Sequence, residues 1–167
     1  REAIEAHWTL GELVEGLAEH RVLGALNGPE RLGLFGNARF RRLLPGERLL
    51  QQGVYSDAMW FVLDGRLEVG MTTAKAELQR MVVLTAGQSV GETSLLSDQP
   101  SDLTAVAMEP TTVLGLPKYV LKSQMQQSPA FRRAMEGLYV SRSLEVFVQK
   151  LPSLAGVPDE LLSALLA

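Results

Sequence analysis

The sequence predicts an α+β protein, in which an antiparallel β-roll or jelly roll follows N-terminal helices and precedes a long C-terminal helix. Helical periodicity dominates before Arg39 and after Pro117, and between them short apolar runs alternate with turn residues. Several short strands at close spacing are typical of sandwiches and barrel-like rolls. The 167 residues are enough for one domain with additions.

Residues 1–20 are expected to form a helical extension. Thr9 and Glu12 have the spacing of a capping box, and apolar residues recur at helical spacing after them. A second helical piece follows in "RVLGALNGPERLGLFG". Gly28 and Pro29 interrupt it, and Pro29 is well placed in the first turn of a new helix.

The β-roll is predicted over residues 21–127. Three stretches carry two apolar runs around a turn pair, at Pro45-Gly46, Asp64-Gly65 and Glu109-Pro110. Asp-Gly is a preferred pair for tight hairpin turns, so "MWFVLDGRLEVG" predicts a hairpin. "TTAKAELQ" predicts a loop or hairpin tip. Trp60 is expected in the core.

A long helix is predicted over residues 128–151, with Ser128 as its N-cap and Pro129 in its first turn. It carries two apolar stripes: Phe131, Met135 and Leu138 in one, and Val140, Leu144, Phe147 and Leu151 in the other. Two stripes predict two partners, the protein's own roll and a second surface. We therefore expect a homodimer through residues 129–151.

The last segment, 152–167, repeats the pattern of "LNGPERLGLFG", with Pro158 matching Pro29. It predicts the truncated start of a second similar domain.

The order of these elements resembles the cyclic nucleotide-binding domain family, over roughly Arg21 to Leu151. "LLPGERLLQQG" is similar to the family's opening strand pair, and "WFVLDGRLEV" to its central hairpin. "LTAGQSVGETSLL" is similar to its Leu-x-x-Gly-x-x-x-Gly-Glu-x-x-Leu-Leu cassette. The resemblance implies a regulatory module of a larger protein that binds a cyclic nucleotide.

The chemistry of the cassette follows from its residues. A glycine lets the backbone approach a ligand closely, and unpaired N–H groups at a helix start attract anions. The resemblance implies that Glu92 accepts a hydrogen bond from a ribose hydroxyl, and that an arginine after the short helix pairs with the phosphate. The candidate ligand residues are Gly91, Glu92, Thr93, Ser94, Leu95, Ser101 and Asp102.

The arginine of that pattern is missing. Ser101 stands in its place, Asp102 follows, and no lysine or arginine occurs from Met81 to Pro117. A charge-assisted hydrogen bond contributes about 1.5–3 kcal/mol, so its loss lowers affinity about 10- to 150-fold. We expect weak or altered binding of a cyclic nucleotide or cyclic dinucleotide. Arg66, Arg80 or another chain are the candidate donors of a replacement.

The alternative is a structural module that binds no ligand and mediates dimerisation or docking through its long helix. The net charge of −3 and the absence of a basic helix argue against nucleic-acid binding by this fragment. Without cysteine or an apolar run of membrane-spanning length, we expect a cytoplasmic protein that does not enter the membrane.

Enzyme activity is not expected, because no nucleophile–base pattern is found. His7 and His20 are weak haem candidates. Glu92, Asp98 and Asp102 lack the spacing of a calcium loop, so no metal site is expected.

Overall fold

The structure, a computed structural model, describes residues 9–150. Helical segments come first: α2 (Leu10–Gly16), the 3-10 helix η1 (Leu23–Ala25) and α3 (Gly28–Phe35). The roll consists of β1 (Arg39–Leu43), β2 (Arg48–Leu50), β3 (Ala58–Asp64), β4 (Leu67–Thr72), β5 (Leu78–Leu84), β6 (Ser89–Val90), α4 (Glu92–Ser97), β7 (Thr104–Ala107) and β8 (Thr111–Pro117). The helices α5 (Lys118–Gln127) and α6 (Pro129–Lys150) follow. This order confirms the predicted α+β roll, whereas the predicted second domain at 152–167 lies outside the described residues.

Local capping fixes where the N-terminal helices begin. Thr9 N–H donates to a Glu12 carboxylate oxygen at 2.7 Å, and Glu12 N–H donates to Thr9 Oγ1 at 3.2 Å, which confirms the predicted capping box. Asn27 and Glu30 form a second box at the start of α3, and a proline lies in its first turn. These caps satisfy amide groups that the helices leave unpaired.

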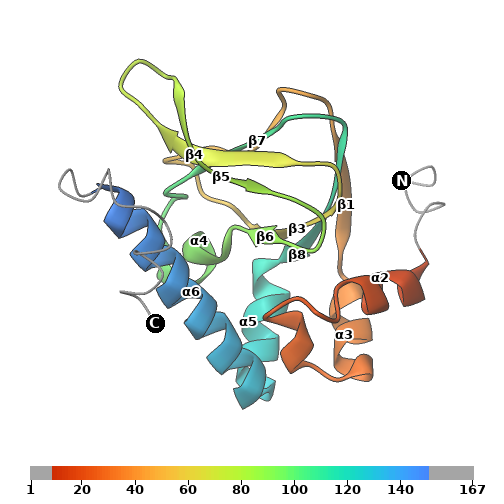
Figure 1. Ribbon diagram of the computed structural model, residues 1–167. Coiled ribbons are helices and arrows are strands. Elements are labelled where there is room, and N and C mark those ends of the chain that lie inside the picture. The colour runs from red at the N-terminus through yellow and green to blue at the C-terminus, as the bar shows by residue number, and fades with distance from the viewer. Residues whose placement is uncertain (1–8, 151–167) are drawn as a thin grey trace.

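The strands form two four-stranded antiparallel sheets, which face each other as a roll (Figure 1). The first sheet has the order β1-β8-β3-β6, and the second has the order β2-β7-β4-β5. The hairpin tip predicted at "TTAKAELQ" is confirmed, because β4 and β5 are antiparallel neighbours on either side of it.

The predicted hairpin around Asp64-Gly65 is wrong as a pairing. β3 pairs with β6 and β8 in the first sheet, whereas β4 pairs with β5 and β7 in the second. The turns at Pro45-Gly46 and Glu109-Pro110 likewise connect strands of different sheets. Each turn is therefore a corner at which a two-stranded ribbon passes from one sheet to the other.

Two of these corners are in contact, the one at Gly65 and the one that ends at Thr111. Gly65 has φ +86°, and a Cβ there would lie 2.5 Å from Thr111 Oγ1. The Thr111 hydroxyl, fully buried, donates to the Glu109 carbonyl at 2.8 Å and accepts from Arg66 N–H at 3.2 Å. The two neighbouring ribbons thus bend at the same place, and contact at the bend leaves no room for a side chain.

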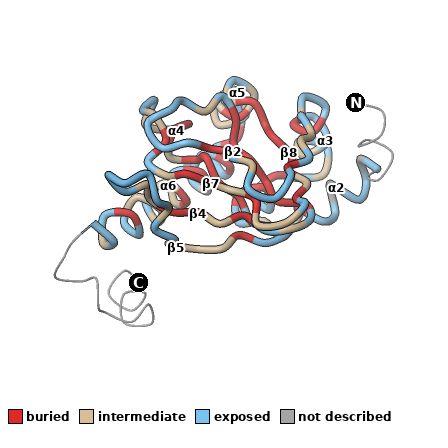
Figure 2. Tube along the Cα trace, turned by 90° about the horizontal axis from the view of Figure 1, so that it is seen from above, coloured by how far each residue is buried: buried red, intermediate tan, exposed pale blue. Residues whose placement is uncertain are grey.

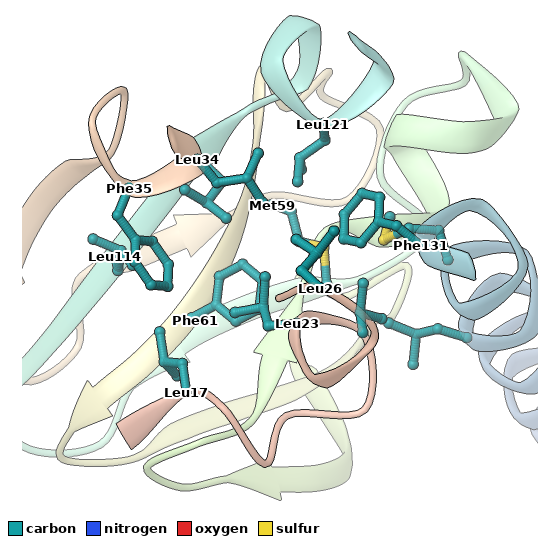
Figure 3. Close-up of a cluster of buried hydrophobic side chains, with 14 of the residues drawn as sticks. Leu17, Leu23, Leu26, Leu34, Phe35, Met59, Phe61, Leu114, Leu121 and Phe131 are labelled. Atoms are coloured by element: carbon teal, nitrogen blue, oxygen red, sulfur yellow. The ribbon is translucent and has the colours of Figure 1, made fainter. Parts of the chain in front are cut away.

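Two apolar cores lie on opposite faces of the first sheet. Figure 2 shows that buried residues are concentrated along the strands and on the inner parts of the helices. Met59, Phe61 and Leu63 of β3 point into a core shared with the helices, which Figure 3 shows around Phe61 and Phe131. Ala58, Trp60 and Val62 point into the core between the two sheets. Trp60 is 6% exposed, so its prediction as a core residue is confirmed.

The long helix α6 runs beside α4 and α5 (Figure 1). Its start agrees with the prediction, because Phe131 N–H donates to Ser128 Oγ at 3.3 Å. The inner stripe of Phe131, Met135 and Leu138 is buried in the helical core. The outer stripe stays exposed within the described part of the chain: Val140 is 54%, Leu144 38% and Phe147 58% exposed.

The corner contact yields a prediction about stability. Gly65→Ala places a Cβ against Thr111 and should lower the free energy of unfolding by about 2–4 kcal/mol, because steric overlap adds to the left-handed backbone cost. Gly46→Ala is the matched control: φ is +84° but nothing lies within 4 Å of the added Cβ, so we expect a loss of about 1 kcal/mol. Urea unfolding measures both, and equal losses would show that the corner contact is not restrictive.

Candidate functional site

The cassette begins at the end of β6 and is fixed to the centre of the first sheet. Val90 pairs with Trp60 of β3, and Gly91 then turns the chain with φ +104°. A Cβ on Gly91 would lie 3.0 Å from the Ala58 carbonyl oxygen. Glycine is therefore required both by the left-handed conformation and by the close approach to β3.

Glu92, the first residue of α4, is buried and faces α6. Its Oε1 lies 3.5 Å from Nε of Arg142, and the Glu92 side chain is only 5% exposed. Its other carboxylate oxygen, Oε2, is buried and has no hydrogen-bond partner among the described residues. Burial raises the pKa of Glu92, and the positive charge of Arg142 acts in the opposite direction.

The rest of the short helix is mostly structural in its contacts. Ser94 Oγ donates to the Gln99 carbonyl at 2.7 Å, and Leu95 packs in the helical core. Thr93 is half-buried, and its carbonyl accepts from Ser97 Oγ at 2.6 Å. No side chain caps the start of α4, because Gly91 occupies that position.

Ser101 forms a turn where the family pattern has arginine. It is 5% exposed, and its hydroxyl donates to the Leu103 carbonyl at 2.7 Å. Its backbone is tied to the loop between β2 and β3, through Ser101 N–H to Val54 O at 3.0 Å and Gly53 N–H to Ser101 O at 2.9 Å. Asp102 is exposed. The structure thus places the two halves of the predicted site differently: Glu92 faces α6, and Ser101 faces the β2–β3 loop.

The cations proposed as replacements are engaged elsewhere. Arg66 pairs with Glu109 at 2.8 Å, and Arg80 pairs with Glu68 at 2.7 Å, both on the surface.

Two lysines lie at the opposite end of the short helix. Lys118 and Lys122 both pair with Asp98, at 2.6 and 3.0 Å. Lys118 also donates to the Ser94 carbonyl at 3.2 Å. This is the C-terminal end of α4, where a cation is favoured by the helix dipole.

Sequence reasoning missed Arg142 as a partner of the cassette. It lies 50 positions after Glu92 on a different helix. No motif or local spacing marks it, and only the packing of α6 on α4 brings the two together. Arg142 also pairs with Glu145 at 3.1 Å, so its guanidinium lies between two carboxylates.

A cavity of about 310 Å³ lies beside Arg142, between α6 and the turn before β6. His20 lines it, and the Val22 N–H donates to His20 Nδ1 at 3.2 Å. The neutral ring therefore carries its hydrogen on Nε2, which donates to Ser89 Oγ at 2.9 Å. Burial lowers the pKa of His20 to about 4, and Arg142 adds to the shift.

Among the described residues, no group of three or more His, Asp or Glu side chains is arranged so that it could hold a metal ion. Glu92 and Asp98 lie at opposite ends of α4. In the same part of the chain, no helix has both the length and the apolar character that crossing a membrane requires.

The comparison with protein families identifies the class of this chain. The family described as the cyclic nucleotide-binding domain matches residues 40–128, more than half of the sequence. The chain therefore belongs to the cyclic nucleotide-binding domain family, a family of regulatory domains.

Individual relatives give the same picture. The cyclic AMP receptor protein of Thermus thermophilus is 32% identical over 89 residues, which are 53% of this chain and 41% of that protein. The sensor domain of the transcriptional regulator DNR from Pseudomonas aeruginosa has a TM-score of 0.73 at 17% identity, covering 86% of this chain and 95% of the other.

A third similar structure is the regulatory subunit of a cAMP-independent protein kinase A from Trypanosoma brucei. It is a three-residue mutant, one change being threonine to arginine, and is bound to cAMP. Its TM-score is 0.67 at 16% identity, with coverage of 95% of this chain and 52% of that one. This chain spans less than half the length of the curated relatives that it matches.

The partly buried His20 predicts a pH dependence of stability. Its folded pKa of about 4 lies below the ordinary value of 6.5, so between these values the unfolded chain binds the additional proton. The contribution of the neutral His20 ring to stability is fully present above pH 6.5. It is lost as the pH falls toward 4, which lowers the free energy of unfolding by about 2–3 kcal/mol.

The comparison is made with His20→Asn, which keeps a hydrogen-bond acceptor near Val22 N–H. Urea unfolding from pH 7 to 4 should show a smaller loss of stability in this variant. The carboxylates titrate in both proteins and cancel in the difference. Identical pH profiles would mean that His20 is not held neutral by its surroundings.

Proposed function

We propose that this chain is a regulatory module for a cyclic nucleotide or cyclic dinucleotide, with weak or altered ligand specificity. The observation that carries the proposal is the cassette itself. A left-handed Gly91 leads into α4, Glu92 is buried with one carboxylate oxygen unpartnered, and Ser101 replaces the cation. A buried carboxylate oxygen without a donor is costly, and a ligand hydroxyl supplies such a donor.

The altered specificity follows from the region around Ser101. A phosphate there would meet a serine hydroxyl already engaged with Leu103, and the exposed carboxylate of Asp102. Arg66 and Arg80 are held in their own ion pairs. The Trypanosoma brucei regulatory subunit that is bound to cAMP carries a threonine-to-arginine change together with two changes to alanine, and an added arginine in a cAMP-bound protein of this fold is in keeping with the proposal.

The first prediction of this proposal concerns restoration of that cation. Ser101→Arg with Asp102→Ala should strengthen binding of cyclic AMP or cyclic GMP about 10- to 150-fold, because a charge-assisted hydrogen bond replaces a repulsion. The measurement is the ligand-induced shift of thermal unfolding at millimolar ligand, with cyclic dinucleotides included. The shift is taken within each variant, so a change in basal stability does not affect it.

The matched control is Gln149→Arg with Glu136→Ala, which makes the same change in net charge at two exposed positions of α6. It should leave every ligand-induced shift as it is in the unmodified chain. A large ligand-induced shift in the thermal unfolding of the unmodified chain would show that the missing arginine does not limit binding. If no ligand shifts the thermal unfolding of either the unmodified chain or the Ser101→Arg, Asp102→Ala variant, the sensory role is contradicted and the structural alternative is favoured.

The structural alternative rests on one observation, the exposed outer stripe of α6. Val140, Leu144 and Phe147 lie on one face of the helix and are all more than a third exposed. Covering such a face removes apolar surface from water, at about 25 cal/mol per Å². We propose that a second copy of the chain covers it, giving a homodimer through residues 129–151.

The test of the dimer is a charge placed on the stripe. Phe147→Glu should shift the chain toward monomer in sedimentation velocity, because a carboxylate at a buried interface is desolvated. Gln149→Glu adds the same charge two residues further along at an exposed position, and should leave the association unchanged. A monomeric unmodified chain, or equal effects of the two variants, would contradict association through this stripe.

A further inference from the structure

A second cavity, of about 630 Å³, lies where the starts of β1, β3 and α5 meet the end of α4. Its described lining includes neither Gly91 nor Glu92 nor Ser101, so it is separate from the cassette. Its volume is within the range of small-molecule sites, which is about 300–1,000 Å³. Nothing in the proposed function uses this cavity.

Positive charge exceeds negative charge in the described lining of the cavity. Arg39 is balanced by Asp57, whose carboxylate lies 3.0 Å away. Lys118 and Lys122, in contrast, share the single carboxylate of Asp98. One positive charge is therefore left without a counter-charge, in a chain whose net charge is −3. Such an excess favours an anionic ligand.

The two ammonium groups converge on one point. The Nζ atoms of Lys118 and Lys122 lie 2.6 and 3.0 Å from the same oxygen, Asp98 Oδ1. Hydrogen bonds from Lys118 and then from Lys122 hold the pKa of Asp98 below its ordinary value, so at neutral pH an incoming anion competes with a carboxylate.

This competition selects the kind of anion. A ligand carboxylate would exchange one monoanion for another and gain little. A phosphate monoester carries a charge of about −1.5 to −2 at neutral pH and offers three strong acceptor oxygens, so it attracts two convergent ammonium groups more strongly. The phosphate of a cyclic nucleotide is a diester with a single negative charge, and it lacks this advantage.

An aromatic ring supplies a different kind of surface in the same cavity. Tyr119 follows Lys118 at the start of α5, lines the cavity and is 69% exposed. An exposed ring offers a face on which a planar group can stack. The cavity thus combines a place for a dianion with a place for an unsaturated organic body.

From this arrangement we propose that the cavity is a second ligand site, for a small organic molecule that carries a terminal phosphate on a planar body. Lys118 and Lys122 bind the phosphate, and Tyr119 stacks on the body. Asp98 occupies both lysines when the ligand is absent and acts as an internal competitor. The site is independent of the cassette and of any cyclic nucleotide bound there.

Phenyl phosphate is the probe, and the measurement is a titration followed by amide chemical shifts in NMR. The shifts should be concentrated at Asp98 and residues 118–122. Lys122→Gln should weaken binding about 3- to 10-fold, because a charge-assisted hydrogen bond is lost at a partly exposed position. Lys75→Gln removes the same charge at the exposed β4–β5 tip and should leave the affinity unchanged.

Removal of the competitor should have the opposite effect. Asp98→Asn should strengthen binding of phenyl phosphate about 3- to 10-fold, because both lysines are released from their carboxylate. Asn also adopts the left-handed conformation of Asp98, whose φ is +53°. Glu77→Gln, at an exposed position, is the matched control for the lost negative charge. A damaged fold cannot produce a gain in affinity.

Two further probes test the two parts of the site. Phenyl sulfate has a similar shape but one negative charge, and should bind the unmodified chain several-fold more weakly than phenyl phosphate. Tyr119→Ala should weaken binding of phenyl phosphate about 2- to 10-fold, because the stacking surface is lost, and should leave binding of inorganic phosphate unchanged.

Several results would overturn the proposal. One is the absence of phenyl phosphate binding at millimolar concentration in both the unmodified chain and Asp98→Asn. Another is equal affinity of Lys122→Gln and Lys75→Gln, or chemical shift changes confined to the cassette at residues 91–95. Equal binding of phenyl sulfate and phenyl phosphate would contradict recognition of a dianion. Displacement of phenyl phosphate by cyclic AMP would show that the two share one site.

Discussion

Burial of β3 on both of its faces is the constraint on which the other elements depend. Six consecutive residues, from Ala58 to Leu63, are buried, so the strand needs a cover on each side. The second sheet supplies one cover, and the helices supply the other. Gly91 rests on the backbone of this same strand, at the Ala58 carbonyl. The cassette therefore takes its position from the best-protected part of the molecule.

The charges around α4 are distributed according to the polarity of that helix. Glu92 lies in its first turn, where a negative charge is favoured, and Lys118 and Lys122 gather at its last turn around Asp98. This arrangement helps to explain how a buried carboxylate is tolerated at the helix start. It also places the lysines at the far end from Glu92, so the positive charge that reaches the buried carboxylate comes from α6.

The sequence was sufficient for the elements and for the hairpin of β4 and β5, but not for the pairing of the other strands. Periodicity and caps identify α2, α3 and the start of α6, because these signals are local. The Asp64-Gly65 turn looked like a hairpin, since the dipeptide specifies a tight bend but not which sheet receives the next strand.

The site residues also divide into those with a local sequence signal and those that come together only in the tertiary structure. The cassette from Gly91 to Leu95 is contiguous and has a recognisable pattern, whereas Arg142 meets Glu92 only because two helices pack together. The contacts of Ser101 with Gly53 and Val54 also depend on tertiary structure.

The strand order has a consequence for how the chain acquires its structure. β8 is the last strand of the described part of the chain, yet it lies between β1 and β3 in the first sheet. Arg39 and Trp60 both pair with Gly115, so the first sheet cannot close until nearly the whole roll has been synthesised. Pairings of such long sequence separation make folding slow, because much chain entropy is lost before the contacts form. Until β8 is inserted, the edges of β1 and β3 with which it pairs have no partner, and unpaired strand edges are prone to aggregation.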